Sequence, residues 1–171
     1  MSKSTQEQIL NKLDIAKINA MQLEAMKTIP KSSSTIILSP TGSGKTVAFL
    51  LPIIQQLDPK CDEVQAMILV PSRELAIQIE QVMRKMGSGY KVNAVYGGRA
   101  GSKDKLELKH RPAVLIGTPG RIAAHFYKES FSTEDIKTLV LDEFDKSLEV
   151  GFEVDMKEIL HELPNVNKRI L

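Results

Sequence analysis

The 171-residue sequence is poor in cysteine, in aromatic residues and in long apolar runs. Its single cysteine, Cys61, excludes an internal disulfide and a zinc site built from several cysteines, and it suits a reducing compartment. The first residues have no apolar core of the signal-peptide kind, and no later apolar run approaches the ~18 residues of a membrane span. We therefore expect a soluble, cytoplasmic protein with no membrane partner.

An excess of positive over negative charge is also nearly absent. The sequence has 23 Lys and Arg residues against 21 Asp and Glu residues, so the formal charge is +2 and gives no general support for a nucleic-acid partner. The apolar fraction of 42% and the charged fraction of 26% are typical of globular chains. The length fits a single domain spanning 1–171.

Five short, β-branched apolar runs have the length and continuity of strands that are covered on both faces. They lie at 35–39, 66–70, 92–96, 113–117 and 138–142. The stretches between several of them have helical spacing, with Ser72 and the pair Thr118-Pro119 as helix starts. This alternation predicts an α/β fold with a mainly parallel β-sheet and helices on both faces.

Four of these runs end directly in unusual polar or glycine-rich sequences. The endings are "SPTGSGKT", "PSREL", "TPGR" and "DEFD". In open α/β sheets, ligands bind at the carboxyl ends of the strands, so we expect the functional site at that edge.

The stretch "SPTGSGKT" matches the phosphate-binding pattern G-x-x-x-x-G-K-[ST], with Ser39 in place of the first glycine. Glycines let backbone N–H groups converge on a phosphate, lysine adds a positive charge, and a threonine hydroxyl can bind Mg²⁺. A glycine-rich turn that merely joins strand to helix is the alternative. The predicted phosphate-binding residues are Thr41, Gly42, Ser43, Gly44, Lys45 and Thr46.

Three acids, Asp142, Glu143 and Asp145, follow the last apolar run. Phosphate hydrolysis needs a carboxylate that holds Mg²⁺, partly through water, and a group that orients the attacking water. Asp142, together with Thr46, is the metal candidate, and Glu143 is the candidate for orienting water. Alone, the acids would be read as a solvated turn; the phosphate loop favours the catalytic interpretation.

In their order, these motifs resemble those of the first RecA-like domain of DEAD-box ATP-dependent RNA helicases. "SPTGSGKT" resembles motif I, "PSRELA" motif Ia, Gly97-Gly98 the GG motif, "TPGR" motif Ib and "DEFD" motif II. The resemblance covers nearly the whole chain and implies a RecA-like P-loop domain that uses ATP and Mg²⁺. It also implies catalytic roles for Lys45, Asp142, Glu143 and Asp145, the last coupling the ATP site to a later motif. Phe144 replaces the family's alanine, and we expect it to pack inward against neighbouring helices.

Gln22 aligns with the glutamine that reads adenine in the family's Q motif. Residues 1–30 are therefore expected to form a Q-motif-like helical segment before the P-loop core at 31–171. The sequence "INAMQ" departs from the usual motif, and the segment upstream has no aromatic residue to stack on adenine. The alternative is that Gln22 is an exposed helix residue.

The resemblance also implies that one RNA strand contacts the middle motifs. Guanidinium groups, hydroxyls and bare backbone N–H groups suit phosphate and read no base, so we expect sequence-independent binding. An ion pair with Glu74 or another carboxylate is the alternative for Arg73, and a helix cap is the alternative for Thr118. The predicted RNA-binding residues are Pro71, Arg73, Gly97, Gly98, Thr118, Gly120 and Arg121.

Two further features of the sequence add no residue to the predicted site. The polar stretch 97–112 is expected to be a loop and an exposed, solvated helix. The three histidines lack metal-ligand spacing.

Because the family continues into a second RecA-like domain, the chain is expected to be a fragment that binds nucleotide weakly and is nearly inactive alone. The second domain would supply arginine side chains to the transition state. The rival functions are a DNA helicase or another P-loop ATPase, and a non-catalytic nucleotide-dependent RNA-binding scaffold. Whether a protein cofactor exists is left open.

Overall fold

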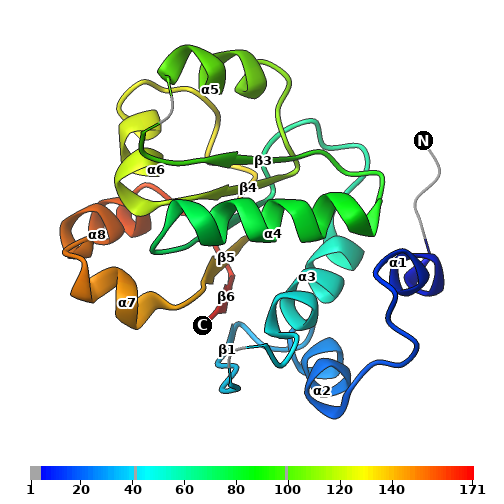
Figure 1. Cartoon of the computed structure of the whole chain (residues 1–171). Helices are drawn as coiled ribbons and strands as arrows, with labels where there is room; N and C mark the ends of the chain where they lie inside the picture. Colours follow the sequence, from blue (N-terminus) through cyan, green and yellow to red (C-terminus); the bar gives the residue numbers. More distant parts are fainter. Residues whose placement is uncertain (1–4, 41, 99) are drawn as a thin grey trace.

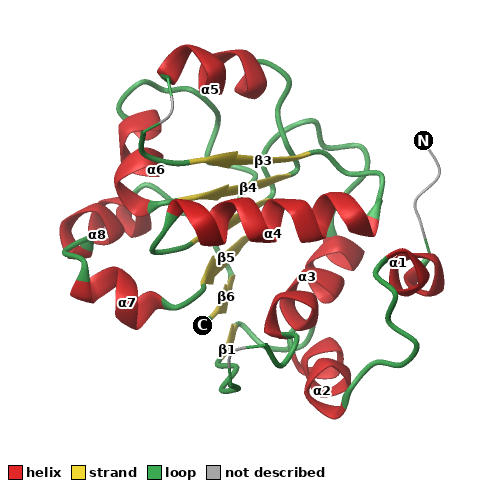
Figure 2. Cartoon of the chain, in the orientation of Figure 1, coloured by secondary structure: helices red, strands yellow, loops and turns green. Residues whose placement is uncertain are grey.

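The structure, a computed structural model, describes residues 5–40, 42–98 and 100–171. A parallel sheet with strand order β1-β6-β5-β2-β4-β3 runs through it (Figure 1, Figure 2). The strands are β1 Ser34–Thr35, β2 Ala66–Leu69, β3 Val92–Val95, β4 Val114–Gly117, β5 Thr138–Leu141 and β6 Lys168–Ile170. The helices are α1 Gln6–Lys12, α2 Ala20–Thr28, α3 Lys45–Gln56, α4 Arg73–Met86, α5 Gly101–Leu108, α6 Pro119–Phe126, α7 Phe144–Glu149 and α8 Glu153–His161. The predicted parallel α/β fold is confirmed.

The central strands send alternate side chains into two helical layers. In β2, Ala66 and Ile68 pack in one core with residues of α3 and α4, whereas Met67 and Leu69 pack in a second core with residues of α6 and α8. Figure 1 shows α4 lying across the strands in front, with α6 and α8 close together at the left. Burial on both faces explains why these strands are continuous apolar runs in the sequence.

The first predicted strand, 35–39, is largely wrong. β1 has only two residues, and Ile36 and Leu38 are 66% and 90% exposed. β1 lies at the edge of the sheet beside β6, and the hydrogen bonds between the two segments end with the Ile37 N–H donating to the Leu171 carbonyl (2.7 Å). An edge strand has a neighbour on one side only, so its apolar run is not covered as a central strand is.

Helix starts follow the sequence only in part. The Ser72 hydroxyl accepts the N–H of Leu75 (3.2 Å), which confirms the predicted cap of α4. Thr118 occupies the cap position of α6, yet its side chain makes no capping hydrogen bond. The helix of the polar stretch, α5, is not simply solvated, because Asp104 and Leu108 are buried.

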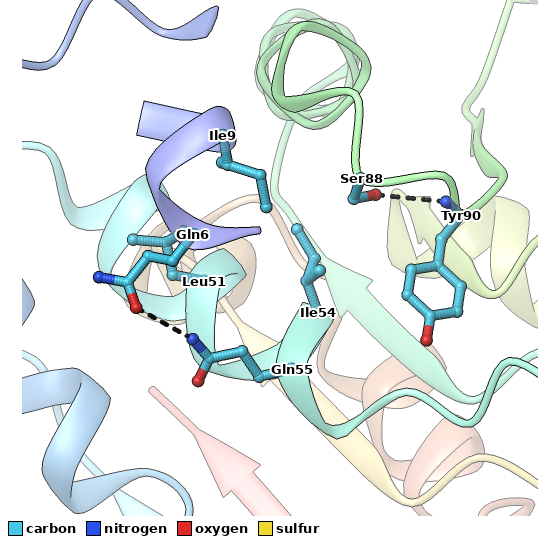
Figure 3. A pocket seen from close by; sticks show the side chains of 7 residues that line it. All are labelled: Gln6, Ile9, Leu51, Ile54, Gln55, Ser88 and Tyr90. Carbon is cyan, nitrogen blue, oxygen red and sulfur yellow. Dashed lines mark hydrogen bonds between the residues drawn. The ribbon is translucent and has the colours of Figure 1, made fainter. Parts of the chain in front are cut away.

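The two N-terminal helices pack on the same core as α3 and α4, with Ile9 and Ala25 among the buried residues. Where α1 meets α3 and the connection from α4 to β3, a cavity of about 230 Å³ remains (Figure 3). Ile9, Leu51 and Tyr90 are among its lining residues. Within the described residues, no helix combines the length and apolar character needed to cross a membrane.

Candidate functional site

The phosphate loop joins β1 to α3 through two glycines with left-handed backbone. Gly42 has φ +80° and Gly44 has φ +87°, a region that glycine enters without steric cost. Gly44 is the N-cap of α3, and Lys45 and Thr46 form its first turn, so the positive end of the helix dipole faces the loop. Thr41 lies outside the described residues. The loop has the backbone that an anion cradle needs.

Two amide side chains at the start of α2 hold the end of this loop. Asn19 Nδ2 donates to the Ser43 carbonyl (3.0 Å), and Gln22 Nε2 donates to the Gly44 carbonyl (3.2 Å). Gln22 Oε1 also accepts the N–H of Asn19 (3.1 Å) in a capping box. Gln22 is 4% exposed, so the alternative that it is an exposed helix residue is wrong. A Cβ added at Gly44 would lie 2.5 Å from Gln22 Nε2, so a larger residue would displace the end of the Gln22 side chain, and it would be strained at φ +87°.

Ser39, which stands in place of the first motif glycine, forms part of the loop. Its hydroxyl lies 2.8 Å from the hydroxyl of Ser43. The departure from the sequence pattern therefore adds a hydrogen bond that ties the beginning of the loop to its end.

The carboxylate predicted to hold a metal lies directly after β5 and is largely buried. Leu141 pairs with Leu69, and the Asp142 N–H donates to the Leu69 carbonyl (3.0 Å). Burial raises the pKa of the Asp142 carboxyl, and the positive charge of Lys45 partly opposes that rise. The structure thus brings the loop lysine and the strand-end carboxylate, far apart in the sequence, within electrostatic reach of each other.

The three residues after Asp142 turn away from the sheet. Glu143 has φ +50°, which is uncommon for this residue type, and its carboxylate pairs with Lys146 (2.9 Å). Asp145 is exposed. Phe144 is 37% exposed, so the prediction that it packs inward is wrong. The reason is that α7 is short and, of its residues, only Ser147 is buried.

Four strand ends lie level at the carboxyl edge of the sheet. Leu69 pairs with both Gly117 and Leu141, and Gly117 also pairs with Val95. The segments that follow these strands therefore leave the sheet side by side, as expected for a ligand site in a parallel sheet. Those segments carry Pro71, Gly97, Gly98, Thr118 and Asp142.

The alternatives for two predicted RNA-binding residues have different outcomes. Arg73 pairs with Glu74 at 3.4 Å, as the alternative proposed, but both side chains are more than half exposed and such a pair contributes only about 0–1 kcal/mol. The guanidinium therefore stays accessible. The Thr118 side chain makes no capping bond. Around Gly98, at φ +77°, the space that a Cβ would fill is open, and at Gly120 a Cβ would make ordinary contacts of 3.6 Å.

Arg121 is held by a buried carboxylate that the sequence did not single out. Arg121 Nε and Nη2 each lie 2.7 Å from Asp104 Oδ2. His125 Nε2 lies 3.0 Å from the same oxygen, and its Nδ1 lies 3.1 Å from the Ser130 hydroxyl. Asp104 is fully buried and His125 is 5% exposed. This network fixes α5, α6 and the segment after α6 to one another.

A family model for DEAD/DEAH box helicases matches residues 19–171, which include every candidate site residue described above. The chain belongs to the DEAD/DEAH box helicase family. The predicted family and its RecA-like fold are thereby confirmed.

Individual relatives agree with this assignment. The chain is 41% identical over 150 residues to the ATP-dependent RNA helicase CshA of Listeria monocytogenes, covering 85% of the chain and 29% of the relative. It is 34% identical over 165 residues to the ATP-dependent RNA helicase DeaD of Escherichia coli, covering 95% and 26%. The crystal structure of a DEAD box protein from Methanococcus jannaschii superposes with a TM-score of 0.86 at 28% identity, over 99% of this chain and 48% of that one. The chain thus spans under a third of these curated relatives and about half of the solved chain.

The site of this DEAD-box domain fits a nucleotide bound together with magnesium. Within the described residues, no three histidine, cysteine or acidic side chains gather to hold a metal by themselves. The Thr46 hydroxyl and the Asp142 carboxylate are hard oxygen ligands, and Mg²⁺ is usually held by one or two such groups plus phosphates and water.

Sequence reasoning missed Asn19, Asp104 and His125. Asn19 could have been found, because N-x-x-Q at a helix start is a variant of the capping-box signature. Asp104 could not, because an acid within the lysine-rich stretch "SKDKLELK" looks solvated. His125 was assigned no role, yet it is a buried partner of Asp104.

Proposed function

We propose that this chain is the ATP-binding domain of an ATP-dependent RNA helicase, which couples ATP hydrolysis to sequence-independent RNA binding and to duplex unwinding or remodelling. The carrying observation is that a glycine loop with left-handed Gly42 and Gly44 leads into the N-terminus of α3, where the charge of Lys45 acts on the buried Asp142 carboxylate at the end of β5. A phosphate cradle beside a metal carboxylate is the combination that phosphoryl transfer requires. The names of the relatives support the same activity.

In this proposal each residue of the chain has a defined task. Backbone N–H groups from Gly42 to Thr46 bind the phosphates, and Lys45 adds its charge to them. Thr46 and Asp142 hold Mg²⁺, which when bound neutralises charge on the phosphates. Glu143 orients the attacking water while its carboxylate is steadied by Lys146. Asp145, which is exposed, couples the site to later parts of a longer protein.

Adenine recognition by Gln22 belongs to the same proposal, although the Gln22 amide already binds Asn19 and Gly44. Gln22 lies against the phosphate loop, so it is positioned to sense whether the loop is occupied. A gain in ATP affinity over GTP affinity through Gln22 would support direct reading of the base.

RNA would cross the carboxyl edge of the sheet and touch the segments after β2, β3 and β4. The side chains and backbone groups there suit phosphate and read no base. A second RecA-like domain would complete both sites, and the partial coverage of the relatives leaves room for it. A cytoplasmic location is part of the proposal and is supported by the lone free cysteine.

Calorimetric titration of the chain with ATP and Mg²⁺ tests the nucleotide site. Lys45→Ala should weaken binding about tenfold or more, because a charge-assisted contact contributes ~1.5–3 kcal/mol. Lys60→Ala, which changes an exposed lysine in a loop, should bind as the parent does. Equal affinity of Lys45→Ala and the parent would contradict the proposal.

Anisotropy titrations with labelled single strands of matched sequence test the nucleic acid. RNA should bind more tightly than DNA. The reverse order would favour a DNA helicase, and nucleotide binding without binding of either strand would favour another P-loop ATPase.

A further inference from the structure

A groove of about 1120 Å³ runs between α5 and the segment that follows α6. One wall is formed by α5 residues that include Lys105 and Leu106, and Lys109 follows them at the end of the helix. The other wall includes Lys128 and Ser130. In Figure 1 the chain after α6 passes beneath α5, which lies at the top of the molecule.

The groove concentrates positive charge in a chain whose net charge is only +2. Lys105, Lys109 and Lys128 are exposed, and no carboxylate of the described residues lies within ion-pair distance of them. Arg111 also lines the groove but is paired with Glu63 (3.3 Å). Against these cations, Glu129 is the acid among the described lining residues. The surplus charge is therefore available to a polyanion.

The groove is continuous with the predicted RNA-binding residues. Gly101, which lines it, begins α5, and a Cβ there would lie 3.5 Å from Arg121 Nη2. His125 lines the groove as well and shares Asp104 with Arg121. A strand that passes Arg121 at the carboxyl edge of the sheet thus meets the mouth of the groove next.

We propose that this groove binds the sugar-phosphate backbone of a further stretch of the same single-stranded RNA. The inference rests on the proposed function. Lys105 and Lys109 are four residues apart, so their side chains point to one side of α5, toward the Lys128 wall. Lysines that meet phosphates add salt-dependent affinity without reading sequence. Leu106 is 70% exposed and gives sugars and bases an apolar surface beside the lysines.

The experiment compares two triple variants of the chain in anisotropy titrations with labelled RNA. Lys105→Ala/Lys109→Ala/Lys128→Ala removes the groove charge. Lys17→Ala/Lys27→Ala/Lys31→Ala removes the same charge from exposed lysines in and around α2, at the opposite end of the molecule from α5 (Figure 1). Each is titrated with a short strand of about 6 nucleotides and a long one of about 15 nucleotides over a range of salt concentrations.

The groove variant should bind the long RNA about tenfold more weakly at low salt and the short RNA as before. Its slope of log affinity against log salt should fall in magnitude by about 2, since each phosphate contact contributes ~0.7 for single strands. The α2 variant should match the parent in both measurements. Circular dichroism checks the fold, and Lys128→Glu, a change outside the helices, gives a second test if the triple variant is unfolded.

The outcomes separate this inference from the proposed function. If the parent binds both strands and the two triple variants bind the long RNA equally, the groove inference is wrong and RNA binding stands. If the parent binds neither strand, the RNA proposal itself fails. Labelled polyglutamate is titrated in the same way as a second polyanion. If loss of the groove lysines weakens the binding of polyglutamate but not of RNA, and RNA does not compete with polyglutamate, the groove belongs to an acidic protein partner and the inference is overturned.

Discussion

The two ends of the candidate site are anchored in different ways. At the phosphate loop, the neutral amides of Asn19 and Gln22 hold backbone carbonyls at 3.0 and 3.2 Å. At the far end, the guanidinium of Arg121 is held at 2.7 Å by the buried carboxylate of Asp104. Neutral hydrogen bonds contribute ~0.5–1.5 kcal/mol each, whereas breaking a buried ion pair costs ~3–5 kcal/mol. The difference suggests a phosphate-loop end that can adjust to a ligand and an Arg121 end, predicted to bind RNA, that is rigid before any ligand arrives.

The largest effect is expected from Asp104→Ala. The substitution leaves the largely buried Arg121 and His125 without their shared acceptor, so the free energy of unfolding should fall by about 3–5 kcal/mol. Urea denaturation measures the change. Asp62→Ala, at an exposed position, should change stability by less than about 0.5 kcal/mol. A loss below about 1 kcal/mol for Asp104→Ala would show that the α5–α6 end is no more firmly anchored than the phosphate loop.

Gln22→Ala should have a smaller effect on stability and a more specific effect on binding. Losing its hydrogen bonds to Asn19 and Gly44 should lower the free energy of unfolding by about 1–3 kcal/mol, with Gln81→Ala on the exposed face of α4 as the control. Calorimetric titration with ATP and GTP separates two roles. Equal losses of affinity mean that Gln22 only shapes the loop, whereas a larger loss for ATP means that it also reads adenine.

Features set by local chemistry could be predicted from the sequence. The Ser72 cap and the central strands follow from residue type and spacing, and the structure has them as expected. That the charge of Lys45 acts on Asp142 also followed, because parallel strands end at one edge of the sheet.

Features set by tertiary position could not be predicted. The run at 35–39 has strand composition, but its place at the edge leaves Ile36 and Leu38 exposed. Asp104 is surrounded in the sequence by lysines and serine, and only the packing of α5 against α6 buries it. Phe144 was expected to pack inward against neighbouring helices, yet the short α7 offers it no core. In each case, composition describes the residue, while exposure depends on neighbours that are distant in sequence.

Burial makes the negative charge of the Asp142 carboxylate costly in the folded chain. The pKa of the Asp142 carboxyl is raised in the folded chain, so stability from this group is present below the ordinary aspartate pKa and is lost as pH rises through the folded pKa. Without Mg²⁺, Asp142→Asn should therefore melt at a higher temperature than the parent near neutral pH, and the gap should shrink as the pH falls. Melting curves between about pH 4.5 and pH 8 measure this. A variant that melts lower at neutral pH would mean that attraction to Lys45 outweighs burial.

The smallest effect on stability is expected from Phe144→Ala. The substitution tests whether α7, which follows Glu143, is held in place by packing of the Phe144 ring. Because Phe144 is 37% exposed and begins a helix with little burial, its loss should change the free energy of unfolding by less than about 0.5 kcal/mol. Phe131→Ala is the matched comparison. Phe131 is 7% exposed and packs edge-on against Phe126, with the two ring centroids 5.6 Å apart. Its loss should lower the free energy of unfolding by about 3–5 kcal/mol. Comparable losses at the two positions would mean that α7 is held to the domain through Phe144, and the residues after Asp142 would then belong with the rigid end of the site.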